Sequence, residues 1–198
     1  LVRALDDKLE RTRDRTYRLL LLIYPWKDMS AARYPLSRGD VRARAAALEY
    51  LDNLFDSALR RRVLPMLDDT SIEEKVRQAN ALLRTRPRAL DDALAQLVHD
   101  DDPVVASAAI HCAVELGVRV LADDLEYVEA HSAAHVPCVG EAASWALAGW
   151  RAPDGDAESP SRPWPTVDLA SRLRAIRLFD VASVDELFRV AEAGRKVG

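Results

Sequence analysis

The sequence predicts an all-α fold, and more narrowly an α-solenoid of stacked helical hairpins. Three observations lead to this prediction. Apolar residues recur at helical spacing in almost every segment, helix-favouring residue types dominate the chain, and one helix-pair pattern recurs along it. The chain has 198 residues, of which 49% are hydrophobic and 30% charged, so it is long and apolar enough to bury a sizeable core.

The predicted helices are joined by short connections, so neighbouring helices should pack antiparallel. They cover residues 2–24, 39–55, 57–69, 71–84, 87–102, 103–117, 121–133, 136–150, 167–179 and 183–194. Several ends carry local signals, namely capping boxes, first-turn prolines and terminal glycines. These signals are Ser71 with Glu74, Ser183 with Glu186, Pro87, Pro103, Pro137, Gly117 and Gly194.

A valine near the start of each second helix marks the repeat. Val41, Val76, Val105 and Val139 are separated by 35, 29 and 34 residues, which lies within the range for arrays of helical hairpins. A lone hairpin cannot bury its apolar face, whereas stacked hairpins share one continuous core. We therefore expect at least three stacked hairpins between about residues 35 and 150.

The repeated segments resemble HEAT repeats. The Asp-Val-Arg at residues 40–42 is similar to the turn and helix start of that family, as is the Val-Arg at residues 76–77. The segment LVHDDDPVVASAAIHCAVELG is also similar, with Asp102 as the turn acid. It departs from the family pattern at Ala106, and the next unit departs at Gly140, where the family usually has Arg.

The end of the chain carries a second resemblance. Residues 151–166 are rich in proline and small polar residues and are predicted to form a linker, with Trp164 as an anchor onto a neighbouring surface. The following segment, IRLFDVASVDELFRVAEAGRKV, resembles the helical lead-in of cyclic nucleotide-binding domains. The matching residues are Ile176, Leu178 and Phe179 before the helix, and Leu187, Phe188 and Ala191 within it. The barrel that follows in that family is absent from this sequence.

The order of these parts resembles a larger protein class. RTRDRTYRLLLLIYPWKDMSAA and RAAALEYLDNLFDSALRRRVLPMLDD look like segments of bacterial proteins related to ATP/ADP translocases. In those proteins a membrane transporter domain precedes HEAT repeats and a cyclic nucleotide-binding domain. The resemblance implies a helical lead-in at 1–34, a HEAT-like array at 35–150, the linker at 151–166, and the start of a truncated cyclic nucleotide-binding domain at 167–198.

The same resemblance implies that this is the middle fragment of a membrane protein, lying on the cytoplasmic side. A chain that begins at Leu1 rather than Met agrees with a fragment. The most apolar run, residues 19–24, is far shorter than the roughly 20 residues that span a bilayer. Membrane contact would then come only from the part before Leu1, and the fragment alone would bind no cyclic nucleotide.

Few residues suggest a binding surface. Ser107, His111 and Glu115 form one polar stripe on an otherwise apolar helix, which is either simply its polar side or the lining of a concave groove. The run Arg60, Arg61 and Arg62 is a small basic face that is either solvated or in contact with an anionic ligand. Phe188 completes the candidate surface, because the helix that carries it is expected to dock on the repeats.

Two other constellations are interpreted as incidental. His131, His135 and Cys138 have a spacing that suits zinc, but Pro137 interrupts the helix and no fourth ligand is evident. The other set mimics the sugar- and phosphate-binding elements of cyclic nucleotide-binding domains but precedes the lead-in helix. It consists of Gly140, Glu141, Arg151 and Ala152. The acidic runs 100–102 and 123–124 are expected at solvated helix ends.

The leading functional hypothesis is a non-catalytic scaffold that joins a transporter-like membrane domain to a cyclic nucleotide-sensing domain. Its partners would be protein surfaces, mainly other domains of the same chain, and it would need no cofactor. The sequence has no phosphate-binding loop, nucleophile elbow or dinucleotide fingerprint. The alternatives are a HEAT-like nucleic-acid-binding or base-excision protein, which the net charge of −4 disfavours, and a metal enzyme built on His131, His135 and Cys138.

Overall fold

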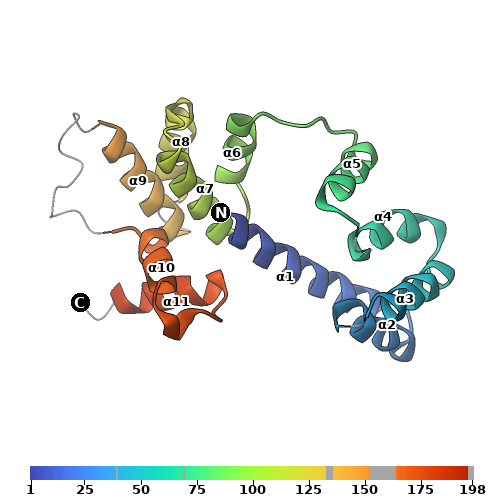
Figure 1. The fold of residues 1–198 in the computed structure, drawn as a ribbon. Helices are drawn as coiled ribbons and strands as arrows, with labels where there is room; N and C mark the ends of the chain where they lie inside the picture. Colours follow the sequence, from blue (N-terminus) through green and yellow to red (C-terminus); the bar gives the residue numbers. More distant parts are fainter. Residues whose placement is uncertain (39, 69, 133–135, 152–163, 196–198) are drawn as a thin grey trace. The chain divides into compact units, whose positions relative to one another are not determined.

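The computed structural model describes residues 1–38, 40–68, 70–132, 136–151 and 164–195, and these residues form helices and connecting turns without a strand (Figure 1). The predicted all-α class is therefore confirmed for this part of the chain. Its α-helices are α1 (Val2–Leu20), α2 (Trp26–Arg38), α3 (Val41–Leu54), α4 (Ser57–Leu67), α5 (Ile72–Leu83), α6 (Leu90–Val98), α7 (Pro103–Glu115), α8 (Ala122–Ser132), α9 (Pro137–Arg151), α10 (Thr166–Arg174) and α11 (Val184–Arg195).

The chain divides into two compact units. Unit 1 contains residues 1–11 and 88–198, and unit 2 contains residues 12–87. One boundary therefore falls inside α1 and the other falls before α6. These units are defined by their internal contacts, whereas the four-part division at 34, 150 and 166 was predicted from resemblance and stays a prediction.

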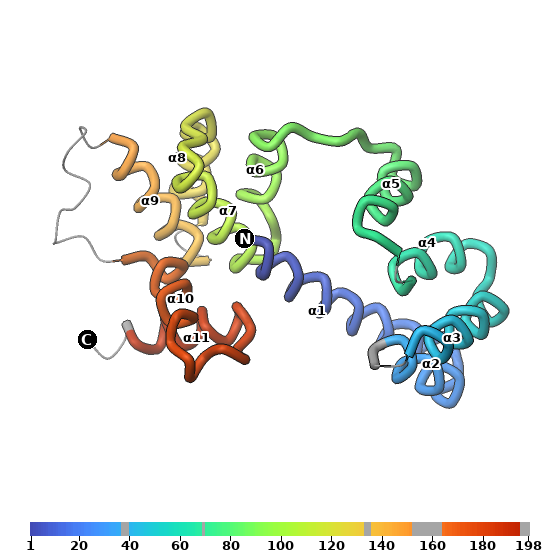
Figure 2. The backbone as a smooth tube through the Cα atoms, viewed as in Figure 1, coloured from blue at the N-terminus to red at the C-terminus, as the bar shows by residue number. Residues whose placement is uncertain are grey.

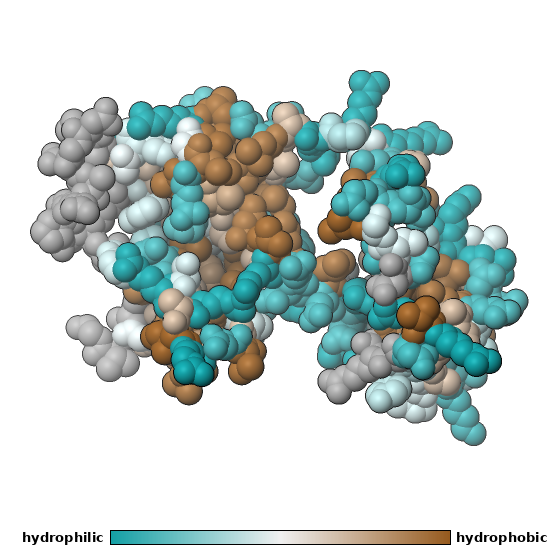
Figure 3. Space-filling view, in the orientation of Figure 1, coloured by the Kyte–Doolittle hydropathy of each residue, from teal (hydrophilic) through white to brown (hydrophobic). Residues whose placement is uncertain are grey.

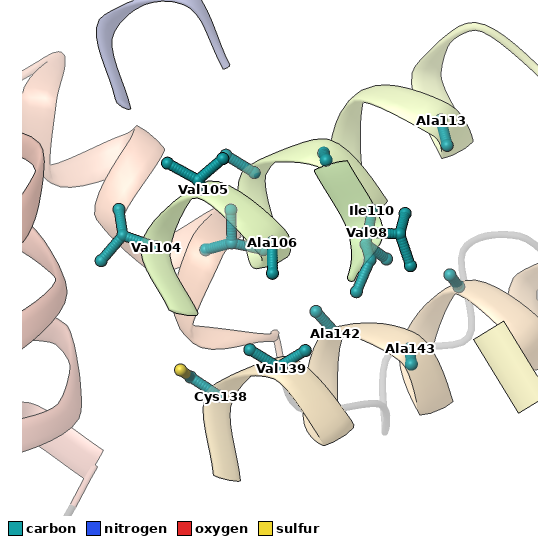
Figure 4. Packing of buried hydrophobic residues seen from close by; sticks show 14 of the residues in the cluster. Val98, Val104, Val105, Ala106, Ile110, Ala113, Cys138, Val139, Ala142 and Ala143 are labelled. Atoms are coloured by element: carbon teal, nitrogen blue, oxygen red, sulfur yellow. The ribbon is translucent and has the colours of Figure 1, made fainter. Parts of the chain in front are cut away.

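The core of unit 1 centres on α7. Eight of its 13 residues are buried, including Val105, Ala109 and Ile110, each with no exposed surface. Small side chains on α9, among them Ala142 and Ala143, let the two helices approach closely (Figure 4). A helix that is apolar on nearly every side must be surrounded, and α7 indeed contacts α6, α9, α10 and α11.

Unit 2 has a smaller core of its own. Met29 and Leu36 from α2 and Leu51 from α3 are almost completely buried, and the rings of Tyr24 and Phe55 lie 5.3 Å apart. Helix α2 was not predicted, although its residues 26–34 fall within the expected N-terminal lead-in at 1–34. Pro25 directly precedes it, at a position where proline favours helix initiation.

Most predicted helix signals are confirmed, and two are wrong. Pro103 and Pro137 are the first residues of α7 and α9, and Gly117 has a left-handed φ of 68° just beyond α7. Pro87 does not open a helix, because α6 begins only at Leu90. Gly194 does not end one, because α11 runs to Arg195.

The first, fifth and ninth predicted helices are too long. Helix α1 stops at Leu20, where residues 21–24 form a turn before Pro25. Helix α6 covers only Leu90–Val98, because His99 and the following acids form the turn into α7. The predicted helix 167–179 breaks after Arg174 and ends in the 3₁₀ turn Arg177–Phe179.

The four marker valines do not occupy equivalent positions. Val105 and Val139 are 0% and 5% exposed, whereas Val41 and Val76 are 87% and 52% exposed. The valine period therefore marks core positions in α7 and α9 of unit 1 but surface positions in α3 and α5 of unit 2. Stacking of all the hairpins in one solenoid stays a prediction.

Candidate functional site

The most connected polar cluster in the described residues lies where α1, α7 and α11 meet within unit 1. We call it the ionic junction and define it as Asp7, Lys8, Arg11, Asp100, Asp101, Asp102, Val184 and Asp185. Figure 2 shows the first turns of α1 beside the start of α7, and hydrogen bonds join residues of these two segments. It joins the beginning of the chain to residues about 90 and 175 positions later.

Arg11 is the central cation of the ionic junction. Its two terminal nitrogens donate to the carboxylates of Asp102 and Asp185. Asp102 also N-caps α7, because its Oδ1 accepts from the backbone N–H of Val104 at 3.0 Å and of Val105 at 3.3 Å. One guanidinium therefore links the first turn of α7 to the first turn of α11.

Lys8 neutralises the remaining acids of the turn. Its Nζ donates to Asp100 Oδ1 at 2.5 Å and to Asp101 Oδ1 at 2.8 Å. Burial lowers the pKa of Lys8, but the hydrogen bonds and charges of the two carboxylates outweigh burial and raise the pKa overall. The hydrogen bond from Lys8 lowers the pKa of Asp101. The acidic run lies at a helix start as predicted and the Asp101 side chain is 92% exposed, but Asp100 is largely buried and the run is also paired with α1.

Helix α11 is attached to this junction at its N-terminus and to the core along its side. Asp7 Oδ2 accepts from the backbone N–H of Val184 at 2.7 Å. The predicted capping box is confirmed, because Ser183 N–H donates to Glu186 Oε2 at 2.9 Å and Glu186 N–H donates to Ser183 Oγ at 3.2 Å. Phe188 is 4% exposed and packs in the same cluster as α7, so it is a core residue rather than an exposed contact.

The predicted polar stripe on α7 runs from the core to the surface. Ser107 is completely buried, the His111 side chain is 20% exposed, and the Glu115 side chain is 67% exposed. His111 Nε2 lies 3.4 Å from Glu115 Oε1, and its ring is 6.3 Å from the ring of Trp145 on α9. The three residues share one side of the helix but do not line a common groove, because the buried Ser107 is inaccessible to another molecule.

The predicted basic face lies in unit 2 on α4. Arg60 Nε pairs with Asp52 at 3.1 Å, and Arg60 Nη2 donates to the carbonyl of Phe55 at 3.3 Å. Arg61 and Arg62 are exposed. Arg60 therefore braces the turn between α3 and α4, and the basic face and the α7 stripe belong to different units.

Two of the three candidate metal ligands, His131 and Cys138, are engaged in contacts within the protein. His131 Nδ1 lies 2.7 Å from the carbonyl of Tyr127, and the two rings stack at 4.0 Å. Cys138 is buried, and burial raises the pKa of its thiol against a smaller lowering by Ser107. His135 lies outside the described residues. Among the residues that are described, no group of three side chains could hold a metal ion.

The residues that mimic a cyclic nucleotide site make structural contacts. Glu141 Oε2 accepts from the backbone N–H of Thr166 at 3.2 Å and from its hydroxyl at 2.8 Å, which caps α10. Arg151 Nη2 pairs with Glu126 Oε1 at 2.6 Å. Gly140 is buried inside α9, and Ala152 lies outside the described residues. Glu141 thus fixes the first turn of the helix that follows the predicted linker.

Trp164 is the anchor that the sequence predicted at the end of the linker. The guanidinium carbon of Arg172 lies 2.9 Å from the centre of its ring, so the indole rests on α10. Most of the predicted linker, residues 152–163, lies outside the described part of the chain. The contact places Trp164 against α10, the helix that directly follows it, whereas the sequence predicted an anchor onto a neighbouring surface.

Comparison with known proteins gives no family for this chain: no family, curated protein or solved structure matches it. Within the described residues, every helix is too short or too polar to cross a lipid bilayer. Sequence reasoning missed the ionic junction. The signal was present in α1, where Asp7, Lys8 and Arg11 lie on neighbouring sides of one helix and carry charges complementary to the acidic run and the start of α11.

Proposed function

We propose that this chain is a non-catalytic α-helical scaffold that couples a membrane domain preceding it to a cyclic nucleotide-sensing domain following it. The HEAT-like solenoid and the lead-in of a cyclic nucleotide-binding domain are part of this proposal and rest on resemblance. In this arrangement α1 is the segment that arrives from the membrane domain. Helices α10 and α11 are the segment that leads into the sensor.

The observation that carries the proposal is the shared guanidinium of Arg11. It belongs to the arriving segment and donates to Asp185 of the departing segment and to Asp102 at the start of α7. The backbone of Val184 adds a second link through Asp7. A displacement of α11 would therefore break contacts of α1 directly, without passing through the rest of the array.

The coupling works through a shift between two arrangements of α11. In the docked arrangement, Leu187, Phe188 and Ala191 are buried in the core of unit 1 and Arg11 is paired. Nucleotide bound to the sensor can move α11 only if the sensor binds it with different affinity in the two arrangements. The ionic junction stabilises the docked arrangement. The more it does so, the larger the ratio between the two nucleotide affinities must be before nucleotide can move α11.

The test measures the distance between α1 and α11 in the full-length protein. After Cys112→Ser and Cys138→Ala, spin labels at Glu10 and Val190 report the distance by pulsed electron resonance, and both positions are exposed. We expect added nucleotide to shift the distribution and Arg11→Ala to broaden it without nucleotide. A distribution that no cyclic nucleotide changes, although the sensor demonstrably binds one, leaves only a passive spacer and defeats the proposal.

A further inference from the structure

Unit 2 has an open groove that neither the ionic junction nor the proposed coupling uses. It has a volume of 430 Å³ and is lined mainly by α3 and α4, with Gln78 of α5 at one side. Leu48, Leu64 and Pro65 form its apolar floor, and all three are only partly buried. We call this feature the acidic groove, because of the charges on its rim.

The acidic groove lies on top of a filled core. Leu51 and Leu67 beneath it are 0% and 3% exposed, so the hollow is a feature of the surface and not a packing defect. Pro65 lies inside α4 and has no backbone N–H, so one turn of the helix lacks its usual hydrogen bond there. Its ring therefore adds an apolar patch where a regular helical residue would place a more mobile side chain.

The rim of the acidic groove carries more negative than positive charge. Glu49, Asp52 and Asp68 contribute three carboxylates, and Arg60 contributes the one cation among the described lining residues, which gives a net charge of −2. Arg60 is already held by Asp52 and by the carbonyl of Phe55. An incoming cation therefore meets an excess of carboxylate, whereas an incoming anion meets repulsion.

The shape and the charge together select one kind of occupant. Leu48, Leu64 and Pro65 give the acidic groove an apolar floor at the surface, and the carboxylates of the rim border that floor. A helix that lies in a groove inserts apolar side chains spaced three or four residues apart and keeps its charged side chains at the rim. Membrane surfaces and nucleic acids are polyanions, so the acidic rim disfavours both.

We propose that the acidic groove binds a cationic amphipathic helix of a partner protein. The apolar seam of that helix covers Leu48, Leu64 and Pro65, and its lysines or arginines meet the carboxylates of the rim. The proposal is independent of the coupling function, because every lining residue belongs to unit 2 and the ionic junction belongs to unit 1.

The test uses the 198-residue chain and a fluorescent 18-residue helical peptide with leucines on one side and lysines on the other. Fluorescence anisotropy should show saturable binding that weakens with salt, because the rim charges remain partly solvated. Glu49→Lys should lower the affinity about tenfold, since Glu49 is exposed, whereas the other two rim acids, Asp52 and Asp68, are half-buried. Asp123→Lys on α8 makes the same change of net charge in unit 1 and should leave the affinity within about twofold.

Two further probes separate groove binding from simple charge attraction. A version of the peptide with glutamates in place of the lysines should not bind. Spermine, added at the same total concentration of positive charge as the peptide, should not displace it. A photo-reactive leucine analogue in the peptide should attach to α3 or α4. The proposal is overturned by the absence of saturable binding, by equal losses in Glu49→Lys and Asp123→Lys, or by attachment in unit 1.

Discussion

Helices α7 and α5 begin with similar sequence signals and end in opposite environments. Both were predicted as second helices of a hairpin, and both have an N-cap side chain and a marker valine. Eight residues of α7 are buried, whereas no residue of α5 is. Ile72, Val76 and Leu83, on one side of α5, are 69%, 52% and 69% exposed. Helical periodicity thus identifies a helix but not whether another element covers its apolar side.

The difference follows from the composition of the two helices. Helix α7 has alanines, valines and a serine around most of its circumference, so neighbours can approach it from several directions. Helix α5 has charged or amide side chains on all but one side, so it can be covered from one direction only. In the space-filling view, hydrophobic side chains gather over α6 to α8, whereas those near α5 form small separate areas (Figure 3).

The largest expected effect comes from placing one charge at the two marker positions. Val105→Asp should destabilise unit 1 by at least about 3 kcal/mol, because the carboxylate would be buried without a partner. Val76→Asp should change stability by less than about 1 kcal/mol, because the side chain is half exposed. Thermal unfolding followed by circular dichroism and calorimetry measures both. Similar melting temperatures for the two variants would show that the contrast between α7 and α5 is wrong.

The second test compares an ion pair from each unit. Arg11→Ala should cost about 1 kcal/mol, because Arg11 serves two carboxylates whose side chains are only 15% and 25% exposed. Arg33→Ala should cost about 0.5 kcal/mol or less, because Arg33 and Asp14 are both about half exposed. Urea unfolding of each variant gives the two values. An equal loss of unfolding free energy in the two variants would show that the ionic junction contributes no more to stability than an ordinary surface ion pair.

A smaller difference is expected between two helix caps. Glu141→Ala should lower stability by about 1 kcal/mol, because Thr166 would lose the acceptor of both its N–H and its hydroxyl. Ser71→Ala removes the exposed 3.3 Å bond from the N–H of Glu74 and the hydrogen bond between Ser71 and Glu73, and should cost about half as much. Unfolding in urea would contradict this order if Ser71→Ala were the more damaging change.

Glu141→Ala also tests the mimicry of a cyclic nucleotide site. Titration calorimetry of the 198-residue chain with cyclic AMP and cyclic GMP should give no heat of binding in either the wild type or the variant, because the carboxylate already caps α10. Micromolar binding by the wild type that is lost in Glu141→Ala would mean that the residues are a nucleotide site after all.

The smallest expected effect concerns acid stability. Backbone and side-chain hydrogen bonds from Ser183 lower the pKa of Glu186, and hydrogen bonds from its own backbone and from Ser71 lower the pKa of Glu73. A lowered folded-state pKa means that each carboxylate stabilises the protein above its ordinary pKa of about 4.3. That contribution is lost as the pH falls through the lowered value. Glu186→Gln and Glu73→Gln should therefore each reduce the acid dependence of the melting temperature slightly, and a steeper dependence would contradict the assignment.

The sequence was most informative where one residue decides a local conformation. Asp102, Ser71 and Ser183 were placed correctly at helix starts, because a cap depends on neighbours within three residues. It was least informative where distant segments meet. The pairing of Arg11 with Asp102 and Asp185 depends on the folded path of the chain. Val41 is exposed because no described element packs over its side of α3, which its local sequence does not reveal. That Glu141 is not a ligand site stays a prediction, and its contact with Thr166 could not be derived from the sequence.

The split composition of unit 1 has a consequence for how the protein is made. Unit 2 is one continuous stretch, so it can fold as soon as residue 87 has left the ribosome. Unit 1 needs residues 1–11 together with 88–198, and the bond between Asp7 and Val184 closes a loop of 177 residues. Closing so long a loop costs entropy before any contact is gained. During synthesis Lys8 and Arg11 can therefore meet the acids at 100–102 first, whereas the contacts of Arg11 with Asp185 and of Asp7 with Val184 form only after α11 has been made.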